Sequence, residues 1–158
     1  ADMDLAYEAA SHYRANYTDV NRLVPGAYEL ISELKRKYKI GIVTNNLVDE
    51  QIRKLKEGKI EHLVDNMITS EEVKVTKPNP EIFLELMKRL NVKANECMMV
   101  GDYWESDIMG AHALGIKCIW VNVYGIQCPD PEMAVEVKSL EEVQMIIACH
   151  SLLPAAGR

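Results

Sequence analysis

Polar side chains follow two short apolar runs of the kind that form buried strands. Thr44 and Asn45 come directly after Ile40–Val43, and Asp102 lies just beyond Cys97–Val100. In an open parallel sheet the carboxyl ends of the strands meet at one edge, where ligands bind. A hydroxyl group and the backbone N–H groups of a helix N-terminus can hold phosphate oxygens, and carboxylates are ligands that magnesium prefers. These residues therefore favour phosphate chemistry at that edge.

A lysine and a second carboxylate extend this set. Lys77 stands in Val75–Pro80, which reads VTKPNP and is interpreted as a rigid loop before a helix, and Asp107 follows Asp102 in the next turn. Lysine supplies positive charge for an oxyanion or for a nearby carboxylate. Each residue also has a simpler interpretation: Thr44 could cap a helix, Lys77 could lie on the surface, and the two acids could cap and solvate the following helix.

Three neighbours of these acids are less informative. Glu105 is interpreted as a helix-surface acid. Tyr103 and Trp104 could line a substrate pocket or could simply pack in the interior. The four histidines share no metal-ligand spacing and receive no role.

The elements that must position these residues alternate between strand and helix patterns from about residue 25 onwards. Short apolar runs predict strands at 40–43, 66–69, 97–100, 117–121 and, more weakly, 134–137. Apolar spacing predicts helices at 27–37, 47–57, 80–90, 104–114 and from a Ser139 cap to about Cys149, with a Ser70 cap and one helical turn between strands. This order predicts a three-layer α/β/α sandwich around a mostly parallel, Rossmann-like sheet with right-handed crossovers.

The two ends of the chain differ from this pattern. Apolar and aromatic residues recur at helical intervals from Leu5 to Tyr17, which predicts a helix over residues 3–17. Residues 151–158 are small and polar, and we expect a loose tail there. One core domain over residues 21–150 is therefore expected.

Composition excludes several classes of protein. The chain of 158 residues is 48% hydrophobic, with a net charge of −6 and no basic stripe, which argues against disorder and against nucleic acid as a partner. No apolar run approaches the roughly 20 residues of a membrane span, and no signal peptide is recognised. Cys97, Cys118, Cys128 and Cys149 form no CxxC pair, so we expect buried, reduced thiols and a cytoplasmic protein.

Three stretches carry a resemblance to a known family. IVTNN, KPNPEIF and VGDYWESD resemble, in order, the second, third and fourth motifs of the haloacid dehalogenase superfamily. The run from Met99 to Ile116 is especially similar to the fourth motif and its continuation, and Leu23–Gly26 resembles the point where such chains re-enter the core after a cap insertion. The resemblance covers about residues 23 to 145.

The resemblance implies a role for each of the residues singled out above. Thr44 would bind the transferring phosphoryl group, helped by the backbone around Asn45, and Lys77 would stabilise the charge of nucleophile and phosphate. Asp102 would ligate Mg²⁺, and Asp107 would either join the metal shell or orient Lys77. The implied activity is that of a magnesium-dependent phosphatase acting on a small phosphorylated metabolite through an aspartyl-phosphate, with a phosphomutase as a variant.

The chain departs from the family at the first motif, DxDxT, which supplies the nucleophilic aspartate. Asp2 and Asp4 have the DxD spacing, but we interpret them as acids at a helix start. In the family this motif ends a strand between those of the second and fourth motifs, so its loss would leave two open strand edges. We expect a truncated chain, with residues 1–20 as the remnant of a cap, or a segment from elsewhere in that place. A homodimer, a partner chain and a non-catalytic phosphate- or metal-binding core remain alternatives.

Overall fold

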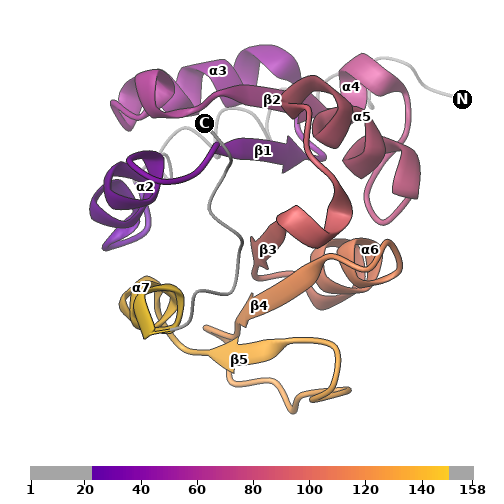
Figure 1. Ribbon diagram of the computed structural model, residues 1–158. Helices are drawn as coiled ribbons and strands as arrows, with labels where there is room; N and C mark the ends of the chain where they lie inside the picture. Colours follow the sequence, from indigo (N-terminus) through magenta and orange to yellow (C-terminus); the bar gives the residue numbers. More distant parts are fainter. Residues whose placement is uncertain (1–22, 150–158) are drawn as a thin grey trace, which may run out of the picture.

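Two groups of parallel strands form the centre of the fold. The computed structural model describes residues 23–149. β1 (Gly41–Thr44) pairs with β2 (Asn66–Thr69) in one sheet. β3 (Met98–Gly101), β4 (Lys117–Val121) and β5 (Val135–Val137) form a second sheet in that order, with β4 in the middle. All the strand pairs are parallel, and the two sheets are drawn apart from each other in Figure 1.

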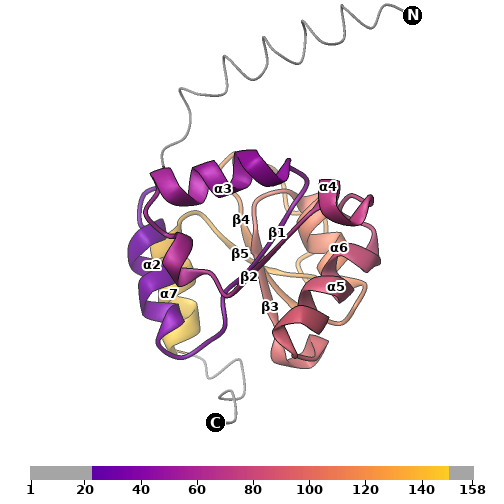
Figure 2. The ribbon, with the colours of Figure 1, turned by 90° about the horizontal axis from the view of Figure 1, so that it is seen from above.

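Helices cover these strands on both sides. They are α2 (Ala27–Lys35), α3 (Val48–Glu57), α4 (Ser70–Val73), α5 (Pro80–Leu90), α6 (Met109–His112) and α7 (Leu140–Cys149), with short turns η2 (Glu61–Leu63), η3 (Ala94–Glu96) and η4 (Trp104–Ile108). Figure 2 shows α2, α3 and α7 on one side of the strands and α4, α5 and α6 on the other. The expected three-layer α/β/α arrangement with parallel strands is therefore confirmed.

Helix α5 illustrates why these segments become helices. Asn79 precedes the helix and its side chain accepts a hydrogen bond from the Glu81 N–H, while Pro80 occupies the first turn, where no helical N–H bond is lost. The helix ends at Asn91, whose left-handed backbone stops it. Four of its apolar residues recur at helical spacing and are buried: Ile82, Phe83, Leu86 and Met87. Burial of each such side chain stabilises the fold by about 1.5–3 kcal/mol.

Strand β4 separates two clusters of the core. Trp120 faces the cluster beneath α5 and α6, where its ring meets that of Trp104 edge to face with centroids 4.9 Å apart. Ile119 and Val121 face the other cluster, beneath α2 and α7. Successive side chains of a strand point to opposite faces, so one short apolar run serves both layers.

Strands β1 and β3 are less covered than β4. β4 is buried from Cys118 to Val121, whereas Ile42 and Val43 of β1 and every residue of β3 are only half-buried. Within the described residues β1 pairs only with β2, and β3 only with β4. The two open strand edges expected from the sequence are therefore present in this part of the chain.

Several predicted boundaries change in the structure. The predicted helix over 104–114 is divided into the π-helical turn η4 and the short α6. The residue that caps α4 is Thr69, whose hydroxyl accepts the Glu72 N–H, so the assignment of the cap to Ser70 was wrong. The first predicted helix stops at Lys35. The predicted helix over 3–17 and the predicted tail at 151–158 lie outside the described residues.

The cysteines are all free, but they are not all buried. Cys118 is buried, Cys97 and Cys128 are half-buried, and Cys149 is exposed, so the expectation of four buried thiols was wrong. Burial raises the pKa of the Cys118 thiol to about 11, and it therefore stays protonated near neutral pH.

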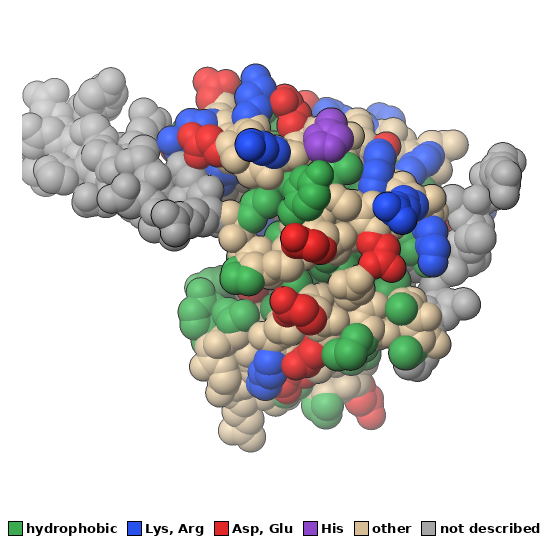
Figure 3. Space-filling model, turned by 90° about the vertical axis from the view of Figure 1, so that its left-hand side faces the viewer, with side chains coloured by type: hydrophobic (Ala, Val, Ile, Leu, Met, Phe, Trp, Pro, Cys, Tyr) green, Lys and Arg blue, Asp and Glu red, His purple; other side chains and the backbone are tan. Residues whose placement is uncertain are grey.

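Charged side chains of both signs mix on the surface. On the face in Figure 3, acidic and basic groups lie among apolar side chains. Lys35 at the end of α2 forms an ion pair with Asp65, while Arg36 and Lys37 are exposed. Among the described helices, none has the length and apolar character needed to cross a bilayer.

Candidate phosphate-handling site

A buried ion pair joins the two groups of strands. Lys77 Nζ lies 2.6 Å from Asp107 Oδ1, and the two side chains are 12% and 6% exposed. Asp107 also accepts hydrogen bonds from the Ser106 hydroxyl at 3.1 Å and from the Tyr103 N–H at 3.2 Å. Both carboxylate oxygens are therefore engaged. Lys77 is not the surface lysine that its position beside proline suggested.

Gly101 allows Asp107 to lie this close to the end of β3. A Cβ atom at Gly101 would come within 2.5 Å of Asp107 Oδ2, so any larger residue would displace the carboxylate. The π-helical turn η4 then brings Asp107 back towards the strand end. These local features explain why the predicted continuous helix is divided at this point.

The side chain of Asn45 holds the backbone of Lys77. Asn45 Oδ1 accepts the Lys77 N–H at 2.8 Å, and Asn45 Nδ2 donates to the Lys77 carbonyl at 3.3 Å. Asn45, Lys77, Asp107 and Tyr103 thus form a continuous chain of contacts from the end of β1 to the end of β3. Both strand ends consequently belong to one site. No sequence pattern indicated this side-chain contact or the contact of Ser106 with Asp107.

Thr44 does not cap the helix that follows it. Its hydroxyl oxygen accepts the Asn46 N–H at 3.2 Å, and α3 begins after Leu47 without a side-chain cap. The first N–H of α3, that of Val48, donates instead to Glu71 at 2.8 Å. A hydroxyl that accepts one hydrogen bond still has a proton to donate, so Thr44 can also bind a phosphate oxygen.

Asp102 differs from Asp107 in being exposed. Its backbone carbonyl accepts the Trp120 indole N–H at 3.0 Å, which fixes the backbone at the end of β3. Within residues 23–149 its carboxylate forms no hydrogen bond or ion pair, so both oxygens can face a ligand. Asp102 does not cap η4, whereas Asp107 accepts the N–H of Tyr103, the residue before η4, at 3.2 Å.

The donor set suits a magnesium ion only in part. The described residues contain no cluster of three or more histidine, cysteine or acidic side chains that could hold a metal. Magnesium, however, often binds one or two carboxylates and keeps several waters. Asp102 fits that requirement through its open carboxylate, whereas both oxygens of Asp107 already have partners.

The two aromatic neighbours of Asp102 differ in how deeply they are buried. Trp104 is 7% exposed and packs against Trp120, which makes it a core residue. Tyr103 is 63% exposed, and Glu105 is also exposed.

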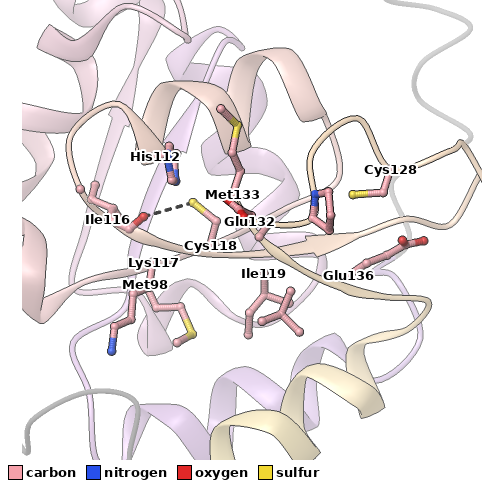
Figure 4. A pocket seen from close by; sticks show the side chains of 14 residues that line it. Met98, His112, Ile116, Lys117, Cys118, Ile119, Cys128, Glu132, Met133 and Glu136 are labelled. Carbon is pink, nitrogen blue, oxygen red and sulfur yellow. Dashed lines mark hydrogen bonds between the residues drawn. The ribbon is translucent and has the colours of Figure 1, made fainter.

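A cavity of about 580 Å³ lies away from this site. Figure 4 shows it beside the first residues of β4, with His112, Cys118 and Met133 among its lining residues. Lys117 opens β4 and also lines the cavity, so the cavity lies at the opposite end of the strand from the site. The protonated thiol of Cys118 makes it unsuitable as a nucleophile there.

The comparison with known proteins agrees with this fold. Residues 3–121, well over half of the chain, match the family model described as haloacid dehalogenase-like hydrolase. The chain therefore belongs to the haloacid dehalogenase-like hydrolase family.

Individual relatives are longer than this chain. Glyceraldehyde 3-phosphate phosphatase of Pyrococcus abyssi is 38% identical over 100 residues, 63% of this chain and 42% of that protein. Pyrimidine 5'-nucleotidase YjjG of Escherichia coli is 33% identical over 129 residues, 80% of this chain and 57% of that protein. The magnesium-bound structure of the HAD-hydrolase YfnB from Bacillus subtilis superposes with a TM-score of 0.73 at 27% identity, covering 81% of this chain and 56% of that one. The chain thus spans about half the length of these relatives.

Proposed function

We propose that this chain forms the phosphate-handling part of a magnesium-dependent phosphatase that acts on a small phosphorylated metabolite. The observation that carries the proposal is the buried Lys77–Asp107 pair, because it holds a cation where the ends of β1 and β3 come together. The relatives named above act on a triose phosphate and on nucleotides, which supports the reaction class and leaves the substrate open.

Each residue then has a distinct task. The Thr44 hydroxyl and the backbone N–H groups after β1 bind oxygens of the transferring phosphoryl group. Lys77 stabilises the negative charge that builds up on phosphate and nucleophile, and Asp107 orients Lys77 through their 2.6 Å contact. A nucleophilic carboxylate attacks phosphorus while the bond to the leaving oxygen breaks. Water then attacks phosphorus of the aspartyl-phosphate, releasing phosphate and regenerating the carboxylate.

Asp102 would hold the magnesium ion, and Asp107 would join the metal shell through a bound water. When bound, the metal neutralises charge on the phosphate and helps to position it. YfnB, the relative whose structure contains magnesium, supports this assignment by analogy.

The nucleophile would arrive on a strand that pairs with the open edges of β1 and β3. The chain contains no DxDxT motif, and these two edges flank the site. Unpaired parallel edges can accept an added strand through main-chain hydrogen bonds. We propose that a further segment, from a longer parent chain, a second copy or a partner, completes the sheet and the site.

The free cysteines fit the expected cytoplasmic setting.

The metal assignment can be tested without turnover. Magnesium should raise the melting temperature of the folded chain, and Asp102→Asn should remove most of that shift because one charged ligand is lost. Glu105→Gln is the matched control, since it neutralises a neighbouring exposed acid that has no assigned role. An unchanged magnesium titration in Asp102→Asn would reject the metal site.

Hydrolysis of an aryl phosphate by the same chain tests the source of the nucleophile. Magnesium-dependent turnover that survives Asp2→Asn and Asp4→Asn would mean that another carboxylate acts as the nucleophile. Turnover abolished by one of those changes would assign the nucleophile to that residue, in the same chain or in a second copy of it. A folded chain that binds phosphate without turnover would support completion by another segment, whereas a chain that binds neither phosphate nor magnesium would overturn the proposed function.

A further inference from the structure

We propose that Asn45 is a positioning residue for Lys77, and that it couples the phosphate-binding loop after β1 to the loop that carries the lysine. The inference rests on the function proposed above, because the coupling matters only if Lys77 meets the phosphate. It concerns the Asn45 side chain, which is distinct from the backbone N–H groups after β1 that were assigned to phosphate binding.

Both polar groups of the Asn45 carboxamide bind the backbone of one residue. Its oxygen accepts the Lys77 N–H at 2.8 Å and its nitrogen donates to the Lys77 carbonyl at 3.3 Å. A side-chain amide has one acceptor group and one donor group, so it can imitate the pairing of a backbone peptide in a sheet. Asn45 therefore attaches the Lys77 loop to the end of β1 as an additional bridge.

The two ends of Lys77 are consequently both held. Asn45 holds its backbone, and Asp107 holds its Nζ at 2.6 Å. The loop itself is closed by a hydrogen bond from the Asn79 N–H to the Thr76 carbonyl at 2.9 Å. A lysine side chain is flexible, so an ammonium group is preorganised only when its backbone and its tip are both fixed.

Asn45 also follows Thr44 directly. A displacement of the Thr44 loop therefore moves the anchor of Lys77, and the two groups proposed to bind the same phosphate are kept in register. Asn46, the next residue in the same loop, differs from Asn45. Its side chain donates to Gln51 at 3.2 Å, and among the described residues it forms no hydrogen bond with the loop that carries Lys77. Asn46→Ala is accordingly a matched control for Asn45→Ala.

The first experiment asks whether the bridge exists in solution. Nuclear magnetic resonance should show slow amide exchange for Lys77 and an observable ammonium signal of its Nζ in the unaltered chain. In Asn45→Ala both should exchange faster, while Asn46→Ala should leave both unchanged. Unaltered Lys77 exchange in Asn45→Ala would overturn the inference, whatever the outcome of any phosphate measurement.

The second experiment asks whether Asn45 acts through Lys77. Titration of the folded chain with inorganic phosphate in the presence of magnesium should show affinity weakened about fivefold to tenfold by Asn45→Ala, the factor expected for one or two lost hydrogen bonds. The same change in a Lys77→Met background should cost less than about twofold, because coupled residues are not additive. An equal loss in both backgrounds would overturn the positioning role. Absence of phosphate binding in the unaltered chain would instead reject the proposed function, and the exchange measurement would still decide the bridge.

Discussion

The strands around the site differ in how completely they are covered. β4 has a strand on each side and is buried from its second residue onwards, whereas within residues 23–149 β1 and β3 each pair with one strand and are mostly half-buried. Helices cover both groups, and Ile68 of β2 is fully buried by α5 packing. Within residues 23–149 β2 also pairs with one strand, so the number of paired neighbours alone does not explain the half-burial of β1 and β3. The site spans the two groups, and Lys77 with Asp107 joins them.

The first prediction, which has the largest effect, compares the covered strand β4 with the half-buried strand β1. Ile119→Ala in β4 should lower the free energy of unfolding by about 4 kcal/mol, because a 1% exposed side chain leaves a cavity when it is truncated. The same chemical change at half-buried Ile42 in β1 should cost about 1–2 kcal/mol. Urea denaturation followed by circular dichroism gives both values. Equal losses would contradict the comparison.

The next effect concerns the ion pair that joins the two groups. Lys77→Met should lower the free energy of unfolding, measured by urea denaturation, by about 3 kcal/mol, because it leaves the buried Asp107 carboxylate without its cation. The double change Lys77→Met with Asp107→Asn should recover most of that loss. Lys35→Met, which removes the cation of the more exposed pair with Asp65, should cost less than about 1 kcal/mol. A loss at Lys77 no larger than that at Lys35 would show that the pair does not hold the groups together.

A smaller effect compares one asparagine in each group. The buried carboxamide of Asn122 binds the Ile126 N–H at 3.0 Å, the Ile126 carbonyl at 2.6 Å and Glu136 at 2.7 Å. Asn122→Ala should lower the free energy of unfolding, measured by thermal or urea unfolding, by about 2 kcal/mol, since it removes the partner of the Ile126 backbone groups and of Glu136. Asn45→Ala removes two exposed hydrogen bonds and should cost about 0.5–1 kcal/mol. The reverse order would contradict the expectation that hydrogen bonds of the buried asparagine contribute more than those of the exposed one.

The smallest effect is a pH dependence in the β1–β2 group. Burial acts to raise the pKa of Asp65, but hydrogen bonds from Lys35 and the Ile40 N–H outweigh it, so its pKa lies below the ordinary 3.8. Ionised Asp65 should contribute less than about 1 kcal/mol to the free energy of unfolding. This contribution should be present above pH 3.8 and should disappear as the pH falls through the lowered pKa of Asp65. Stability of the chain and of Asp65→Asn, compared by urea unfolding at several pH values, should converge on acidification. A gap that widens in acid would refute this account.

The sequence predicted most elements closely where local signals were strong. The apolar runs of β2 and β4 and the proline-initiated helix α5 have the predicted bounds. The division of the predicted helix at η4 depends on Asp107 turning back towards Gly101, which no local pattern reports. The contact of Asn45 with Lys77 joins residues far apart in the chain and was missed for the same reason. The roles assigned to Thr44, Asp102 and Asp107 remain predictions.

The order of strands and helices, the family and the residues proposed for the site could be predicted from the sequence, because apolar periodicity, caps and motifs are properties of neighbouring residues. The folded structure was needed to show that Lys77 is held at both ends and that Asp107 is buried while Asp102 is exposed. It also shows that β1 and β3 each have an unpaired edge within residues 23–149. These outcomes depend on which segments meet in space, and burial and charge pairing act only after they have met.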